Sequence, residues 1–115
     1  MATITPTDPG LTASYPGVVQ KKWALGNADT GVGVSLASFT YKTMTLTGTW
    51  GGATVVIQGA NEDVDASYIT MVDPQGNALS KTADAIETLL ENPLFIRVKS
   101  SGGTGTVVAA IVTAV

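Results

Sequence analysis

The sequence predicts an all-β protein: an antiparallel β-sandwich, jelly-roll-like or related, with an extended N-terminal arm and at most one short helix. Many short segments rich in β-branched residues alternate apolar and polar side chains with the two-residue period of a strand. Clusters of Gly, Pro, Asn and Asp separate these segments and indicate turns. Only residues 84–92 place apolar side chains at helical spacing, with an irregular crossover as the alternative. Many short strands with one short helix are typical of a sandwich or a barrel.

The length of 115 residues predicts one domain, which we place at residues 18–115. Residues 1–17 contain three prolines, which exclude a helix or a central strand and favour an extended arm. Ile4, Leu11 and Tyr15 are apolar residues within this arm. We expect them to anchor the arm on another surface, either this domain or a neighbouring molecule. The alternative for residues 1–17 is a disordered tail.

Two β-hairpins are the clearest local predictions. The first joins residues 44–50 to 53–59 through the Gly51-Gly52 turn, and the second joins 94–99 to 106–115 through a glycine-rich turn. The remaining expected strands are residues 18–25, 32–36, 67–72 and 79–82. Residues 39–44 either continue the strand at 32–36 or form an edge strand.

The last predicted strand, residues 106–115, is apolar on both faces and therefore needs cover on both sides. One cover is the second sheet of the domain, and a neighbouring chain is the candidate for the other. Arg97 lies in an otherwise apolar strand, so it must reach solvent or pair with a carboxylate within or between chains. The predicted protein-interface residues are Ile4, Leu11, Tyr15, Trp23, Arg97, Val108, Ala110 and Val112.

The composition favours burial of surface over chemistry. Hydrophobic residues make up 44% of the chain and charged residues 13%, against a usual share of about 25% charged. The net charge of −3 argues against nucleic acid as a partner, because phosphate binding needs a clustered basic patch. The C-terminal apolar run is far shorter than the roughly 20 residues of a membrane helix, and the N-terminus lacks signal-peptide features. We therefore expect a soluble protein made in the cytosol, with no membrane partner.

The chain has no cysteine and no histidine, which excludes thiol nucleophiles, zinc–thiolate sites and His-based catalytic triads. We therefore expect no enzyme, no catalytic residue, no cofactor and no metal site. Glu62, Asp63 and Asp65 offer oxygen ligands of the kind Ca²⁺ prefers, but the loop lacks the glycine and the distal Glu of an EF-hand. A solvated loop is the favoured interpretation. The acidic residues also show no pairing of the kind that glycoside hydrolysis requires.

The aromatic side chains are the candidates for sugar binding, since flat rings stack on pyranose faces. They are Tyr15, Trp23, Tyr41, Trp50 and Tyr68. Packing in the core or in an interface is the favoured interpretation, because aromatic residues are the usual anchors there.

Three segments carry a resemblance to a known class of protein. They are GTWGGATVVIQG at residues 48–59, DPQG at 73–76 and PLFIRVKSSGGT at 93–104. Across residues 44–112 the chain resembles small β-rich virion proteins of tailed bacteriophages, and among these the head decoration, or cement, proteins in particular. This resemblance implies a β-sandwich domain, usually a homotrimer, on the capsid exterior of the virion. There it would bind the major capsid protein and stabilise the shell by bridging neighbouring subunits.

On that expectation, residues 1–17 form the shell-contacting arm and residues 106–115 lie at or near the trimer axis. The protein would be synthesised in the host cytoplasm. The alternatives are a tail or neck structural protein of the same virion, and a glycan-binding β-sandwich module that uses its aromatic residues.

Overall fold

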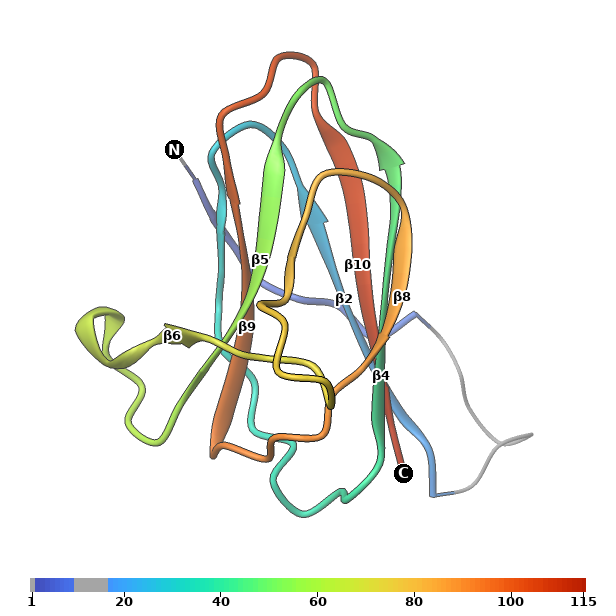
Figure 1. Ribbon diagram of the computed structural model, residues 1–115, viewed down its shortest axis with the longest axis vertical. Coiled ribbons are helices and arrows are strands. Elements are labelled where there is room, and N and C mark those ends of the chain that lie inside the picture. Colours follow the sequence, from blue (N-terminus) through green and yellow to red (C-terminus); the bar gives the residue numbers. More distant parts are fainter. Residues whose placement is uncertain (1, 10–16) are drawn as a thin grey trace.

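Two β-sheets pack face to face in the computed structural model, which describes residues 2–9 and 17–115 (Figure 1). The predicted β-sandwich is therefore confirmed. The six-stranded sheet has the order β1-β3-β9-β5-β6, with β7 also paired to β5, and the four-stranded sheet has the order β2-β10-β4-β8. All strand pairs are antiparallel except β1 with β3.

The strand bounds are as follows. The six-stranded sheet contains β1 (Thr3–Ile4), β3 (Thr30–Gly31), β5 (Thr54–Ala60), β6 (Ile69–Thr70), β7 (Ser80–Lys81) and β9 (Phe95–Ser101). The four-stranded sheet contains β2 (Val19–Leu25), β4 (Lys42–Thr49), β8 (Ala85–Thr88) and β10 (Val107–Ala114). A 3₁₀ turn, η1 (Asp65–Ser67), is the one helical element of the described residues.

The core lies between the sheets and is filled by alternate side chains of each strand, as the strand period requires. Trp23 on β2 is 0% exposed, and its indole Nε1 donates a hydrogen bond to the Val32 carbonyl oxygen at 2.9 Å. Gly31 lies directly beside this ring, since a Cβ atom there would be 2.6 Å from Cδ1 of Trp23. The largest side chain of the core is thus accommodated by the smallest residue on the facing sheet.

The two predicted hairpins are wrong in their pairing, although their four strands exist. β4 pairs with β10, and β5 pairs with β9, so each strand of one expected hairpin pairs with a strand of the other. The glycine-rich turns reverse the chain but carry it from one sheet to the other, across the roughly 10 Å between packed sheets. Each strand keeps its apolar face toward the core in this arrangement.

The two crossing loops contact each other at one end of the sandwich. The Thr104 amide donates to the Gly51 carbonyl oxygen at 3.0 Å, and the Thr106 hydroxyl donates to the Trp50 carbonyl oxygen at 2.8 Å. Gly51 has a φ of 58°, a left-handed conformation that glycine adopts without steric cost. These bonds fix where β5 and β10 begin.

The helix expected at residues 84–92 is wrong, because residues 85–88 form β8, which pairs with β4, and residues 89–92 have no regular secondary structure. In this strand Ile86 points toward solvent, and Leu89, just after the strand, is buried in the core. Asp84 stabilises the start of β8, since its carboxylate accepts hydrogen bonds from the Gly48 amide and the Trp50 indole, at 3.1 and 2.7 Å. Long-range pairing here prevails over the local helical spacing.

The other expected strands are shorter than predicted. Residues 32–36 form only a bridge between Val34 and Ile96, and β4 begins at Lys42. Within 67–72 and 79–82, only β6 and β7 form, and a bridge joins Val72 to Ala78. These segments reach β5 from the same side, so each pairs over a few residues only.

Residues 2–9 of the expected arm lie on the protein's own domain. β1 pairs with β3 of the six-stranded sheet, whereas Thr7 exchanges two backbone hydrogen bonds with Lys22 on β2, at 2.9 and 2.8 Å. The chain therefore passes from the edge of one sheet to the edge of the other, and Ile4 packs partly buried against the core. Within the described ranges, no helix is long and apolar enough to cross a membrane.

Candidate functional site: interaction surfaces

The outer face of the four-stranded sheet is rich in threonine and nearly uncharged. Its side chains alternate with those of the core, and the strand register places them on one surface, which we call the threonine face. It consists of Gln20, Lys22 and Ala24 on β2, Val107, Ala109, Ile111 and Thr113 on β10, Thr43, Thr45, Thr47 and Thr49 on β4, and Ile86 and Thr88 on β8. Lys22 is its one charged residue, and it lies on the strand paired with Thr7.

This face is suited to packing against another flat surface. The β-branched side chains that dominate it are stiff, so ordering them in a contact loses little conformational entropy. Gln20 Nε2 already donates to the Thr113 hydroxyl at 2.9 Å. The strands are about 4.8 Å apart and rise about 3.4 Å per residue, and they contain seven (β2), eight (β10), eight (β4) and four (β8) residues, so the face has an area of roughly 400–500 Å². A stable interface buries about 800 Å² per partner, so this face supplies the larger part of one.

The outer face of the six-stranded sheet carries a network around Arg97, which is only 6% exposed. Its Nε donates to Gln58 Oε1 at 2.8 Å, and its guanidinium forms an ion pair with Asp65 at 2.9 Å. The guanidinium also stacks on the ring of Tyr68, 3.9 Å from the centroid. The expectation that Arg97 pairs with a carboxylate is confirmed, and the partner is Asp65.

The same network holds the acidic loop that precedes β6. The Tyr68 hydroxyl donates to Asp63 Oδ1 at 2.7 Å. Burial of the ring, together with the hydrogen bond to Asp63 and its negative charge, raises the pKa of Tyr68 to about 12, while Arg97 acts in the opposite direction. Asp63 and Asp65, two of the candidate Ca²⁺ ligands, are thus bound to side chains of their own domain. Among the described residues, no group of three or more acidic side chains is placed to hold a metal ion.

The Tyr68 shift predicts a pH dependence of stability. Since the folded pKa lies above the ordinary value of 10.0, the neutral phenol stabilises the fold, and this contribution is present below pH 10. It is lost as the pH rises from 10 toward 12, by about 3 kcal/mol. Phenolate absorbance should show one tyrosine titrating late, and Tyr68→Phe should remove that step. A titration curve that Tyr68→Phe leaves unchanged near pH 12 would contradict this assignment.

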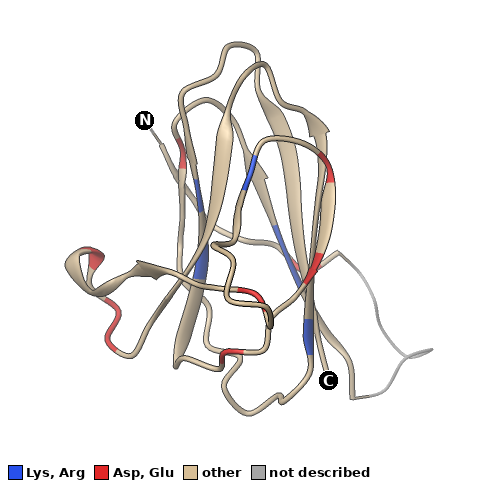
Figure 2. Ribbon diagram, in the orientation of Figure 1, with Lys and Arg blue, Asp and Glu red and all other residues tan. Residues whose placement is uncertain are grey.

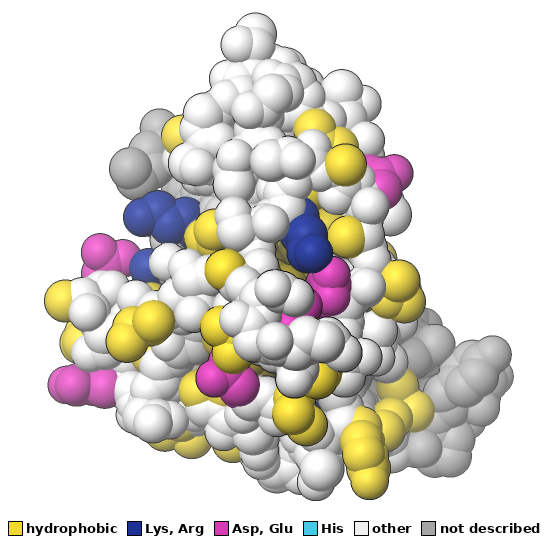
Figure 3. Space-filling model, in the orientation of Figure 1, with side chains coloured by type: hydrophobic (Ala, Val, Ile, Leu, Met, Phe, Trp, Pro, Cys, Tyr) yellow, Lys and Arg dark blue, Asp and Glu magenta, His cyan; other side chains and the backbone are white. Residues whose placement is uncertain are grey.

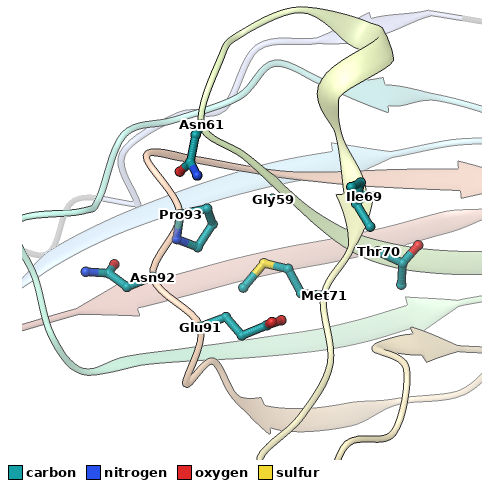
Figure 4. A pocket seen from close by; sticks show the side chains of 8 residues that line it. All are labelled: Gly59, Asn61, Ile69, Thr70, Met71, Glu91, Asn92 and Pro93. Carbon is teal, nitrogen blue, oxygen red and sulfur yellow. The ribbon is translucent and has the colours of Figure 1, made fainter.

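A pocket of about 360 Å³ lies between β6 and the segment before β9 (Figure 4). The side chains of Met71 and Glu91 point into it. The Glu91 carboxylate accepts a hydrogen bond from the Val72 amide at 2.8 Å, so it serves the local structure. Asn61 likewise accepts from the Leu94 amide at 3.0 Å. The pocket offers a mixed apolar and polar lining and no pair of acidic groups arranged for catalysis.

A second pocket, of about 240 Å³, lies where β4 begins and β8 ends. We call it the Lys42 pocket; it is lined by Thr40, Tyr41, Lys42, Thr43, Thr88, Leu89, Leu90 and Asn92. Figure 1 shows the start of β4 near the C-terminus. Lys42 is 2% exposed, and burial lowers its pKa. Sequence reasoning missed this residue. The available signal was its position two residues before Met44 on a strand whose alternate residues are buried.

The predicted interface residues do not form one surface. Val108, Ala110 and Val112 point into the core and are at most 1% exposed, so the alternate residues of β10 form its outer face instead. Trp23 is also a core residue. The register with β2 and β4 decides this orientation, which an all-apolar strand does not reveal. Leu11 and Tyr15 lie outside the described residues.

The aromatic residues do not share a platform within the described part of the chain. Trp23 is buried in the core, and Tyr68 lies against Arg97 on the six-stranded sheet. Tyr41 precedes β4 and Trp50 follows it, so these two lie at opposite ends of that strand. Residues 2–9 and 17–115 therefore offer no stacked pair of exposed rings for a sugar, and Tyr15 lies outside them.

No protein-family model and no curated protein matches the chain significantly, whereas solved structures share its fold. The SPBc2 prophage-derived protein YomS superimposes with a TM-score of 0.63 at 9% identity, over 90% of this chain and 100% of that one. A cupin domain from Bordetella pertussis gives 0.47 at 9% identity, over 98% and 92% of the two chains. The Aeromonas hydrophila PliG lysozyme inhibitor gives 0.44 at 14%, over 98% and 95%. The first comparison shows that a prophage-derived protein has this sandwich fold.

Proposed function

We propose that this protein is a structural virion protein of a tailed bacteriophage, which binds the outer capsid surface and stabilises the shell by bridging neighbouring subunits. The threonine face carries the structural part of this proposal, because a broad, stiff and nearly uncharged surface is suited to permanent contact between subunits. Charged residues are sparse along the chain and form no basic patch in the coloured part of Figure 2. The fold shared with a prophage-derived protein supports the same class of function.

Energetics favour an oligomer over a single contact. At about 25 cal/mol per Å², burying roughly 500 Å² contributes about 12 kcal/mol at most. Association itself costs about 4–15 kcal/mol, so one such contact is marginal. An oligomer whose copies bind the shell at the same time gains affinity through avidity, without any new contact per copy.

We assign the threonine face to self-association, in a homotrimer. β10 lies between β2 and β4, so its outward residues Val107, Ala109 and Ile111 are at the centre of this face. This position supports a trimer axis beside residues 106–115. Residues 1–17 remain the candidate contact with the major capsid protein, residues 2–9 from their place along the edges of the two sheets.

A charge placed on the threonine face tests the assignment. Thr47→Glu puts a carboxylate opposite Ala109 on β10 without touching the core. We expect the trimer to dissociate to monomers, since a carboxylate repeated around the axis is both desolvated and repelled. Light scattering measures the mass, and co-sedimentation with capsids lacking the protein should show at least tenfold lower occupancy, about 1.4 kcal/mol per copy.

The matched control is Thr54→Glu, a threonine on the outer face of the six-stranded sheet. It should leave the trimer and the capsid occupancy unchanged. A monomeric wild-type protein, or a trimer that tolerates Thr47→Glu, contradicts the assigned face. A hexameric ring would instead favour the tail or neck role.

A further inference from the structure

Lys42 is a buried cation whose hydrogen-bond partners are both neutral. Its Nζ donates to the Phe39 carbonyl oxygen at 2.7 Å and to Asn92 Oδ1 at 2.6 Å. The ion pairs of the described residues involve Lys21, Lys81 and Arg97 but not Lys42. An ammonium has three N–H donors, so one of them has no acceptor among these residues. A buried charge without a counter-charge is costly, and a carboxylate beside it would offset much of that cost.

The acidic residues near the pocket in sequence are already engaged. Glu87 forms an ion pair with Lys81 at 2.6 Å, which links the two sheets, and Glu91 accepts the Val72 amide hydrogen. Asn92, the partner of Lys42, is itself fixed by donating to the Ala37 carbonyl oxygen at 2.9 Å. The ammonium is therefore held in place by neutral groups, beside a cavity that the domain leaves open.

The size and rim of the Lys42 pocket indicate which kind of group it can bind. About 240 Å³ is below the roughly 300–1,000 Å³ of small-molecule sites and fits a group the size of one side chain. Tyr41 and Leu90 on its rim are 73% and 66% exposed, unusually high for large apolar residues. Hydrophobic side chains also gather over the lower half of the molecule in the view of Figure 3. The pocket thus combines one buried cation with an exposed apolar border.

We propose that the Lys42 pocket binds an Asp or Glu side chain of a partner protein, whose adjacent apolar residue packs on Tyr41 and Leu90. The carboxylate would form a charge-assisted hydrogen bond with the free N–H of Lys42. A single cation suits one carboxylate, whereas binding a phosphate-rich partner needs a cluster of cations. Identifying the partner as a capsid subunit rests on the proposed function; recognition of the carboxylate does not.

The test uses 3-phenylpropionate as the probe and 3-phenylpropionamide, which has the same shape without the charge, as its control. Nuclear magnetic resonance titration of the full chain should show saturable shifts of the Tyr41, Leu90 and Asn92 amides with the carboxylate. The amide should bind at least tenfold more weakly, a difference of about 1.4 kcal/mol. Lys42→Met keeps an unbranched side chain, without the terminal ammonium, so it should abolish the preference for the carboxylate.

A second variant keeps the test decisive if Lys42→Met does not fold. Leu90→Glu changes an exposed rim residue and should also weaken binding at least tenfold, because the new carboxylate competes for Lys42 and repels the probe. Ile69→Glu, equally exposed but beside the other pocket, should leave binding unchanged. Equal shifts with acid and amide, or no saturable shift at all, overturn the proposal.

Capsid co-sedimentation separates this proposal from the proposed function. If wild-type protein and Lys42→Met, both folded, bind capsids equally, the carboxylate site is wrong as a capsid contact and the virion role stands. If the probe binds as expected but the wild-type protein does not bind capsids, the virion role is wrong and the carboxylate site stands.

Discussion

Replacing Trp23 by alanine should destabilise the protein by about 3–5 kcal/mol, the largest single loss that we expect. The indole is fully buried between the sheets, and its removal leaves a cavity beside Gly31. It also leaves the Val32 carbonyl oxygen without its 2.9 Å hydrogen bond. Because domains of this size have a total stability of about 5–15 kcal/mol, the variant should be close to unfolding. Denaturant unfolding followed by circular dichroism measures the change.

Trp50→Ala is the matched control, since this second tryptophan is only half-buried. Its indole donates to Asp84 at an exposed site, so we expect a loss of about 1 kcal/mol. Similar losses in the two variants would contradict the central place of Trp23 in the core.

Gly48→Ala should lower the free energy of unfolding by about 3 kcal/mol or more. Two physical effects contribute, and a second variant distinguishes them. Gly48 has a φ of 145°, which strains any residue with a Cβ atom. In addition, a Cβ atom there would overlap the carbonyl oxygen of Val107 on the paired strand, and a backbone atom cannot rotate away. Thermal unfolding should show the loss as a large fall in the midpoint temperature.

Gly52→Ala isolates the first of these effects. Gly52 has a φ of 84° but no atom within 4 Å of the added Cβ, so only conformational strain of about 1 kcal/mol applies. If Gly48→Ala and Gly52→Ala lose the same stability, the backbone of Val107 does not approach Gly48 closely enough to exclude a Cβ atom.

The strands could be predicted from the sequence because the two-residue period is a local signal. β2, β4, β5, β9 and β10 all begin and end within about two residues of their expected bounds. Their pairing could not be predicted in the same way. Turn residues show where the chain reverses, but a hairpin and a crossing between sheets leave the same alternation in each strand. Only the packing of all four strands distinguishes the two.

The candidate site was harder to predict for a related reason. Residues 106–115 are apolar at nearly every position, so their sequence does not reveal that Val108 is 1% exposed and Val107 is 69% exposed. Lys42 escaped notice because a lysine on an alternating strand suggests a solvent-facing position. Its burial depends on Phe39 and Asn92, which are brought to it by separate loops.

The exchange of partners between β4, β5, β9 and β10 has a consequence for how the protein is made. The middle of the four-stranded sheet is β10, which the ribosome makes after every other strand, and it must insert between β2 and β4. Gln20 bonds to Thr113, 93 positions later. Such distant pairings fold slowly and late, so a chain that ends before β10 lacks the strand that joins β2 to the β4–β8 pair. Only chains that carry β10 would therefore complete the threonine face, because its central residues Val107, Ala109 and Ile111 lie on that strand.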